Sequence, residues 1–203
     1  MEPPEGRIRF GDASLNLAAG RIAVGYALLA SLATALALAL QDGVPWEHPE
    51  PWLALSTGVA LGLSGGLGLA LALILILATR VCVHRFGWAR GLHVELRPVA
   101  RGLTNSRIVL IAGFSSLGEE LLFRGLLQPW LGLVLASLLF GVVHQLPGSS
   151  RWVWVAWATV VGFALGAIFS LTGSLLGSLV AHAVINAINL AYLRDHEPAD
   201  LPS

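Results

Sequence analysis

The chain consists of long apolar stretches separated by short polar segments. A helix needs about 20 apolar residues to cross the hydrocarbon core of a bilayer, and most of these stretches approach or exceed that length. They cover residues 22–40, 52–78, 108–130, 131–144, 152–171 and 174–193, with 131–144 as the core of its span. The pattern predicts an all-α protein, a polytopic membrane helix bundle of about six transmembrane helices.

The first apolar stretch has a competing interpretation as a signal peptide. Its end, Ala37-Leu38-Ala39, resembles a cleavage site. The apolar run is longer than the core of a usual signal peptide, which has about 7–15 residues. We therefore expect this stretch to stay in the protein as a membrane anchor.

Composition supports a membrane protein. Hydrophobic residues make up 56% of the 203 residues and charged residues 12%, whereas about a quarter of a soluble domain is charged. Twelve basic residues balance twelve acidic ones, so no net field attracts nucleic acid. The single cysteine, Cys82, excludes an intramolecular disulfide.

The charged residues are distributed unevenly between the polar segments. Segment 79–107 contains six arginines, and three more, Arg7, Arg9 and Arg21, come before the first span. The polar segment between the first and second spans, residues 41–50, contains the acidic residues Asp42, Glu47 and Glu50. Because basic residues gather on the cytoplasmic side of membrane proteins, we expect 79–107 to be a cytoplasmic loop and both termini to be cytoplasmic. We expect His84 and His93 of this loop to be solvated.

Small residues and tryptophans predict contacts of the spans. Glycines four residues apart let another helix approach closely, and they occur in three spans as Gly58, Gly62, Gly66, Gly162, Gly166, Gly173 and Gly177. Three tryptophans near the start of the fifth span are typical of an aromatic belt at the lipid headgroups: Trp152, Trp154 and Trp157.

The third span contains charges that are costly in a membrane. It includes the sequence Gly-Glu-Glu-Leu-Leu-Phe-Arg, with charges at Glu119, Glu120 and Arg124. Each ionised residue at a helix centre costs about 2.5–3.5 kcal/mol on insertion scales. Glu120 and Arg124 are four residues apart and can pair. A buried ion pair that fixes helix packing thus explains these two residues but leaves Glu119 without a partner.

Two other spans contain polar residues at helical depth. The fourth span ends in Phe140-Gly-Val-Val-His144, and the sixth contains His182-Ala-Val-Ile-Asn186. His182 and Asn186 are four residues apart and share one helix face. A lone histidine in an apolar helix is usually a packed, hydrogen-bonded residue. Two histidines, an asparagine and a spare carboxylate on three helices instead indicate a site.

This set of groups favours hydrolysis of an acyl compound, and we expect a peptide bond. A carboxylate beside an imidazole can take a proton from water, and a second imidazole with an amide can donate to an oxyanion. The alternative is a zinc ion on Glu119, His144 and His182, with water at the open position. No His-Glu-x-x-His or Gly-x-Ser-x-Gly motif is present.

Together the three motifs, Glu119-Glu120-x-x-x-Arg124, Phe140-x-x-x-His144 and His182-x-x-x-Asn186, resemble the CPBP family of intramembrane proteases. That family includes the CAAX prenyl endopeptidases of the Rce1 type and bacterial relatives once labelled abortive-infection proteins. The resemblance covers roughly residues 103–192. It implies an intramembrane glutamic-type peptidase in which Glu119 and His144 activate water, and His182 and Asn186 stabilise the oxyanion. It further implies that Glu120 and Arg124 support the site, with Phe140 part of the motif, and that no metal is needed.

The resemblance leads to expectations about organisation and partners. We divide the chain into 1–101, with two membrane helices and the basic loop, 102–193, the catalytic bundle, and 194–203, a polar tail. The expected partners are the bilayer and a membrane-embedded or lipid-anchored protein or peptide substrate, and the expected location is the bacterial cytoplasmic membrane. A non-catalytic membrane immunity or scaffold protein is the alternative from another class. A transporter with a proton relay is less favoured, because the two halves show no repeat.

Overall fold

The computed structural model describes residues 10–197, and within this range every regular element is a helix. The all-α prediction is confirmed. In chain order the elements are α1 (Phe10–Leu40), α2 (Thr57–Arg85), α3 (Gly87–Ala100), α4 (Asn105–Glu120), the π-helix η1 (Leu121–Leu127), α5 (Gln128–Val143), α6 (Arg151–Thr172) and α7 (Leu176–Asp195).

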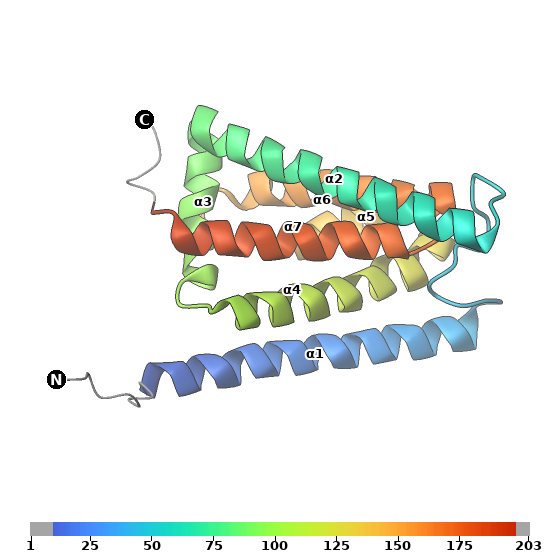
Figure 1. Ribbon diagram of the computed structural model, residues 1–203, viewed down its shortest axis with the longest axis horizontal. Coiled ribbons are helices and arrows are strands. Elements are labelled where there is room, and N and C mark those ends of the chain that lie inside the picture. The colour runs from blue at the N-terminus through green and yellow to red at the C-terminus, as the bar shows by residue number, and fades with distance from the viewer. Residues whose placement is uncertain (1–9, 198–203) are drawn as a thin grey trace.

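Five helical segments of the described residues are long and apolar enough to cross a membrane, so the protein is a multi-pass membrane protein. They are Leu17–Leu40, Thr57–Arg85, Asn105–Val143, Arg151–Thr172 and Leu176–Asp195. The long helices run side by side along the bundle, while α3 lies across one end of it (Figure 1). Helix α1 packs on α4, α4 on α7, α7 on α2, and α5 on α6.

The predicted bundle of membrane helices is confirmed, and among its about six predicted spans the fourth is shorter than the others. The third and fourth spans form one helical run that is broken at Gly132, where φ is +76°. Glycine adopts this left-handed conformation without steric cost, so the chain can turn back there. Residues 133–143 then form about 16 Å of helix, which is half the thickness of the hydrocarbon core. His144 therefore follows a half-length helix.

The segment 79–107 is also more ordered than the loop we expected. Helix α2 continues to Arg85, and α3 follows after Phe86. Buried residues of α3, including Ala89, Leu92 and His93, pack against the end of the bundle. Thr104 then caps α4 by accepting a hydrogen bond from the backbone N–H of Arg107.

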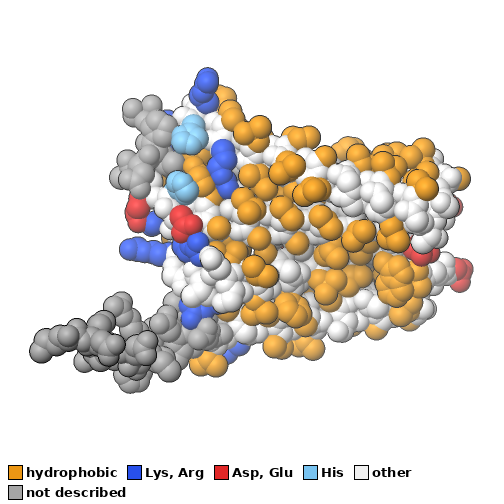
Figure 2. All heavy atoms as spheres, in the orientation of Figure 1, with side chains coloured by type: hydrophobic (Ala, Val, Ile, Leu, Met, Phe, Trp, Pro, Cys, Tyr) orange, Lys and Arg blue, Asp and Glu red, His pale blue; other side chains and the backbone are white. Residues whose placement is uncertain are grey.

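The charge distribution agrees with the asymmetry in the sequence. On the face shown in Figure 2, the arginine side chains gather at the end where α3 lies, and the opposite end shows acidic side chains without basic ones. The first described helix begins and the last one ends at the arginine-rich end (Figure 1). That this end is cytoplasmic remains a prediction.

Glycines bring helices close together, but not all of those we expected. Gly58, Gly62 and Gly66 have open space beside them, so that prediction was wrong. The close approach lies on the neighbouring face of α2, where a Cβ at Gly68 would collide with the backbone of Gly177. Ser64 reinforces this contact, because its hydroxyl accepts from the Gly177 N–H (2.8 Å) and donates to the Ser174 carbonyl (2.9 Å).

Candidate active site

The site is built around the junction where α4 ends and the π-helix begins. Glu119 and Glu120 are the last residues of α4, and Arg124 lies in η1. A π-helix adds a residue per turn and occurs mostly as short pieces, often at functional sites. Here it turns the side chains after Glu120 relative to the α-helical stripe, and nothing in the apolar sequence Leu-Leu-Phe indicated it.

The Glu119 carboxylate contacts three other helices. Its Oε1 accepts a hydrogen bond from the hydroxyl of Tyr26 on α1 (2.9 Å). Its Oε2 lies 3.4 Å from Nε2 of His144 and 3.7 Å from Nε2 of His182. The predicted convergence of the carboxylate and both histidines is thus observed, and Oε2 is buried without a hydrogen bond within protein.

Tyr26 is a site residue that the sequence reading missed. It reaches Glu119 because Gly118 lets α1 come close: a Cβ there would lie 2.9 Å from the Tyr26 carbonyl oxygen. The one available signal was that Tyr26 is a hydroxyl-bearing aromatic residue near the start of the apolar first span.

Glu120 contacts both a histidine and an arginine. Its Oε1 accepts a hydrogen bond from Nδ1 of His182 (2.8 Å), and its Oε2 lies 3.4 Å from Nε of Arg124. The side chains of Glu120 and Arg124 are fully buried, as the predicted ion pair requires. The pair therefore fixes one imidazole of the site as well as the helix packing.

Phe140 connects the imidazoles to the buried arginine. Its ring lies 4.3 Å from the ring of His144 and 5.8 Å from that of His182, centroid to centroid. The guanidinium carbon of Arg124 lies 5.0 Å from the centre of the same ring. Gly162 of α6 leaves room for this arrangement, because a Cβ there would approach Phe140 to 2.9 Å.

The second nitrogen of each histidine determines what Nε2 can do. Nδ1 of His144 lies 2.6 Å from the Phe140 carbonyl oxygen. A carbonyl only accepts, so Nδ1 carries the proton and Nε2 faces Glu119. The Nδ1–H group of His182 donates a hydrogen bond in the same way to the carboxylate of Glu120. Both imidazoles are thereby fixed with Nε2 toward the same carboxylate oxygen.

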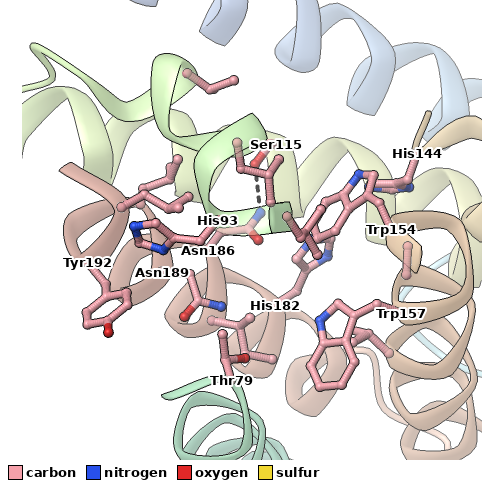
Figure 3. A pocket seen from close by; sticks show the side chains of 18 of the residues that line it. Thr79, His93, Ser115, His144, Trp154, Trp157, His182, Asn186, Asn189 and Tyr192 are labelled. Atoms are coloured by element: carbon pink, nitrogen blue, oxygen red, sulfur yellow. Dashed lines mark hydrogen bonds between the residues drawn. The ribbon is translucent and has the colours of Figure 1, made fainter. Parts of the chain in front are cut away.

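Asn186 lies one helical turn after His182 and lines the same cavity. Its amide nitrogen donates to the Ser115 hydroxyl at 3.3 Å, as the dashed line in Figure 3 shows. Ser115 belongs to α4, one turn before Glu119. The amide is therefore held on the side of the cavity that carries the carboxylate.

These residues line a cavity of about 520 Å³ with contributions from all seven α-helices. Figure 3 shows His144 and Trp154 at one end, His182 and Asn186 between, and Asn189, His93 and Tyr192 at the other end. Apolar side chains form most of the remaining wall, including Ile22, Leu92, Leu96, Val99, Ile111 and Ile185.

Two of the predicted belt tryptophans have a different location. Trp154 and Trp157 line the cavity, and the Trp154 ring lies 6.1 Å from that of His144. Trp152 is 65% exposed, as a residue of an aromatic belt would be. Trp152 differs from Trp154 and Trp157 because residues two and five positions apart on a helix face different directions. One end of α6 can therefore carry both a belt residue and cavity residues.

His84 is exposed, as we expected, but His93 is not solvated. The His93 ring is buried and contacts the Tyr192 ring edge-on. Nε2 of His93 lies 3.1 Å from the carbonyl oxygen of His196. Burial lowers the pKa of His93 below its usual value. The difference follows from α3, which folds this segment over the end of the cavity.

The carboxylates and imidazoles of the site could be considered as metal ligands. Among the side chains that the structure describes, residues 17–197, no three His, Cys, Asp or Glu side chains are arranged to hold a metal ion. That statement includes Glu119, His144 and His182, the ligands that a zinc-dependent alternative requires. Oε1 of Glu119 and the Nδ1 atoms of both histidines are instead engaged in hydrogen bonds within the protein.

Comparison with known proteins supports the resemblance seen in the motifs. Residues 102–188 match the sequence model of the Rce1-like family, described as type II CAAX prenyl endopeptidase Rce1-like. This segment is similar to that family. The match spans the α4–η1 junction, His144, His182 and Asn186.

One curated relative matches part of the chain. It is the uncharacterized protein YpbD of Bacillus subtilis (strain 168), which is 34% identical over 87 residues. Those residues amount to 43% of this chain and 46% of YpbD, so the chain spans less than half the length of the relative it matches. No solved structure matches the chain.

Proposed function

We propose that the protein is an intramembrane endopeptidase that hydrolyses a peptide bond of a membrane-associated protein or peptide. The observation that carries this proposal is Oε2 of Glu119, a buried carboxylate oxygen next to two imidazole Nε2 atoms in a mostly apolar cavity. The Rce1-like match of residues 102–188 supports the same reaction class.

Glu119 acts as the general base. Tyr26 occupies its Oε1, so Oε2 is the oxygen that accepts a proton from water. The resulting hydroxide equivalent attacks the carbonyl carbon of the peptide bond, and His144, 3.4 Å away, helps to orient the water. When the tetrahedral intermediate collapses, the C–N bond breaks and the proton held by Glu119 passes to the leaving amine. Glu119 is then ionised again.

His182 and Asn186 stabilise the oxyanion. Because Nδ1 of His182 donates to Glu120, Nε2 can donate only if the ring is doubly protonated. This role therefore requires the doubly protonated ring, with the Nε2–H group as the first donor. The amide of Asn186 supplies the second donor.

The proposed orientation places the site within reach of the cytoplasm. The cavity extends from Glu119 to the end of the bundle where the arginines gather. If the positive-inside rule sets the orientation, both termini are cytoplasmic and the substrate enters from that side. We place the protein in the bacterial cytoplasmic membrane, with the bilayer and an embedded or lipid-anchored substrate as its partners.

The test compares membrane proteomes of cells that express the wild-type protein or the Glu119→Gln variant, with Asp42→Asn as a matched control at an exposed carboxylate. We expect a membrane protein or peptide to accumulate uncleaved with Glu119→Gln only, at equal expression. Equal cleavage by Glu119→Gln and wild type would contradict the role of Glu119 as a base. Stoichiometric zinc in the purified protein, lost and regained together with activity, would turn Glu119, His144 and His182 into ligands.

A further inference from the structure

Arg80 lies in the same cavity as the candidate catalytic residues, but at its other end. Its side chain donates from Nη1 to Oδ1 of Asn189 (2.9 Å) and from Nη2 to the Ile188 carbonyl (3.2 Å). Its guanidinium carbon lies 3.6 Å from the centre of the Tyr192 ring. Three contacts on α7 thus fix the orientation of the guanidinium group.

None of these contacts neutralises the charge of Arg80. Three arginines have carboxylate partners: Arg124 has Glu120, Arg97 has Glu197 and Arg194 has Asp195. Among the side chains that the structure describes, residues 17–197, no carboxylate forms an ion pair with Arg80. A guanidinium has five N–H donors, of which two are used here. A positive charge with free donors therefore lines an otherwise mostly apolar cavity.

Anchoring of α2 to α7 accounts for only part of this arrangement. An arginine near the end of a span often directs its head toward the lipid headgroups. Arg85, the last residue of α2, is exposed in this way. Arg80 lies earlier on the same helix, is half-buried and faces the cavity. Fixing a helix contact does not require a cation in the cavity that holds Glu119.

The position of Arg80 relative to the site follows from α7. Its partner Asn189 is seven residues after His182 on the same helix face, about 10 Å along the axis. A few residues of extended peptide span this length, at about 3.3 Å per residue. Figure 3 shows Asn189 and Tyr192 at the end of the cavity away from His144.

We propose that Arg80 binds a carboxylate of the peptide substrate, about 10 Å from the bond that is cleaved. A guanidinium fork matches a carboxylate through two parallel hydrogen bonds, and the mostly apolar lining of the cavity accommodates apolar side chains. The carboxylate comes from the chain terminus or from an acidic side chain. This inference rests on the proposed function and names a specificity-determining residue for it.

The experiment measures binding without cleavage. Glu119→Gln protein in phosphatidylcholine nanodiscs is incubated with heptapeptide mixtures randomised over Ala, Val, Leu, Ile and Phe. The mixtures are free acids, C-terminal amides, or amides with one glutamate at each position in turn. Retained peptides are quantified by mass spectrometry. We expect mixtures with a carboxylate to be retained at least about tenfold more than the plain amides, because hydrogen bonds to charged groups are the stronger ones.

Matched variants assign the preference to Arg80. Arg80→Gln should abolish it, Arg80→Lys should keep part of it, and Arg85→Gln should keep all of it. Retention of free acids assigns the carboxylate to the chain terminus, and retention of glutamate-containing amides assigns it to a side chain. Circular dichroism melts establish that each variant is folded. If Arg80→Gln does not fold, the comparison of Arg80→Lys with the wild-type arginine takes its place.

Several results would overturn the proposal. These are equal retention of acids and plain amides, retention of no mixture, and a preference that survives Arg80→Gln or is lost in Arg85→Gln. A preference that vanishes in phosphatidylglycerol nanodiscs would assign Arg80 to a lipid phosphate instead. Since binding needs no hydrolysis, this test and the test of Glu119 as a base can fail separately.

Discussion

The Rce1-like segment and the helices before it contribute to the same cavity in different ways. Residues 102–188 supply the charged groups that contact one another, Glu119, Glu120 and Arg124, together with the imidazoles of His144 and His182. The earlier helices supply groups that act on this cluster from outside: Tyr26 of α1, Arg80 of α2 and the apolar face of α3.

The difference shows how the tasks are divided. The matched segment contains a self-consistent set of charges, since every acidic group in it has a basic or imidazole neighbour. The preceding helices add one hydrogen bond from a neutral hydroxyl, one cation without a carboxylate partner and part of the cavity wall. We infer that the matched segment carries the reaction and that the preceding helices tune it and select the substrate.

The largest effect is expected for Arg124→Ala, within the matched segment. Removing one member of a buried ion pair leaves Glu120 uncompensated and typically costs about 3–5 kcal/mol. We expect less folded protein and a lower melting temperature, measured by thermal unfolding in detergent. Arg85→Ala, which changes an exposed arginine, should melt like the wild type. An Arg124→Ala protein that melts normally yet is inactive would give Arg124 a direct role.

Asn186→Ala should reduce kcat by about 10²–10³-fold, the usual effect of losing one oxyanion donor, with little change in KM. Asn189→Ala provides a comparison on the same helix face, because it loosens Arg80 rather than the oxyanion site. It should raise KM more than it lowers kcat. Steady-state kinetics on a substrate found by the proteome comparison separates the two. Equal effects on kcat would contradict the assignment of Asn186.

Tyr26→Phe tests the contribution of the preceding helices. It removes only the hydroxyl that donates to Glu119, and hydrogen bonds to charged groups contribute enough for about a tenfold fall in kcat. KM should change little, because the aromatic ring still fills the space beside Gly118. Ser31→Ala is the control on the same helix, since the Ser31 hydroxyl bonds only within α1. An unchanged kcat would confine the reaction to the matched segment.

The smallest effect concerns the contact between α3 and the start of α6. Glu95 accepts hydrogen bonds from the hydroxyl of Ser149 and the N–H of Ser150, and these bonds lower the pKa of Glu95 below 4.5. The ionised Glu95 carboxylate stabilises the contact fully when the pH is above the ordinary pKa of a glutamate. This stabilisation is lost as the pH falls through the lowered pKa of Glu95 in the folded protein. We therefore expect hydrogen exchange at Ser150, corrected for its intrinsic rate, to accelerate below about pH 4.

Glu95→Gln should show this faster exchange already at neutral pH, since an amide accepts more weakly than a carboxylate. Exchange at Ser150 that is the same in wild type and Glu95→Gln at every pH would show that α3 is held by its apolar face alone.

The sequence predicted the chemistry of the site better than its shape. Charges in an apolar span are costly enough to stand out, so Glu119, Glu120 and Arg124 could be found, and the four-residue spacing gave the ion pair correctly. Tyr26 could not be paired with Glu119, because a contact between α1 and α4 depends on the close approach at Gly118. That approach is a tertiary property with no local pattern.

The same reason explains the other differences. Hydropathy gives the length of an apolar stretch but not the backbone angle at Gly132, so the half-length helix was read as a full span. The amphipathic pattern of α3 was obscured by its arginines, and His93 was therefore expected to be solvated. The catalytic roles of Glu119, His144, His182 and Asn186 remain predictions, as does the division of the chain at residues 101 and 102.

The half-length helix after Gly132 has a consequence for how water reaches the reaction. Residues 144–150 contain no helix, although they cover the depth between the end of α5 and the start of α6. Non-helical backbone is unfavourable in contact with lipid tails, because its N–H and C=O groups need hydrogen-bond partners that the tails do not provide. Lipid must therefore be kept away from this stretch by protein and by hydration. For the proposed hydrolysis, this stretch would give water a path to Glu119 along the polypeptide rather than through the lipid tails.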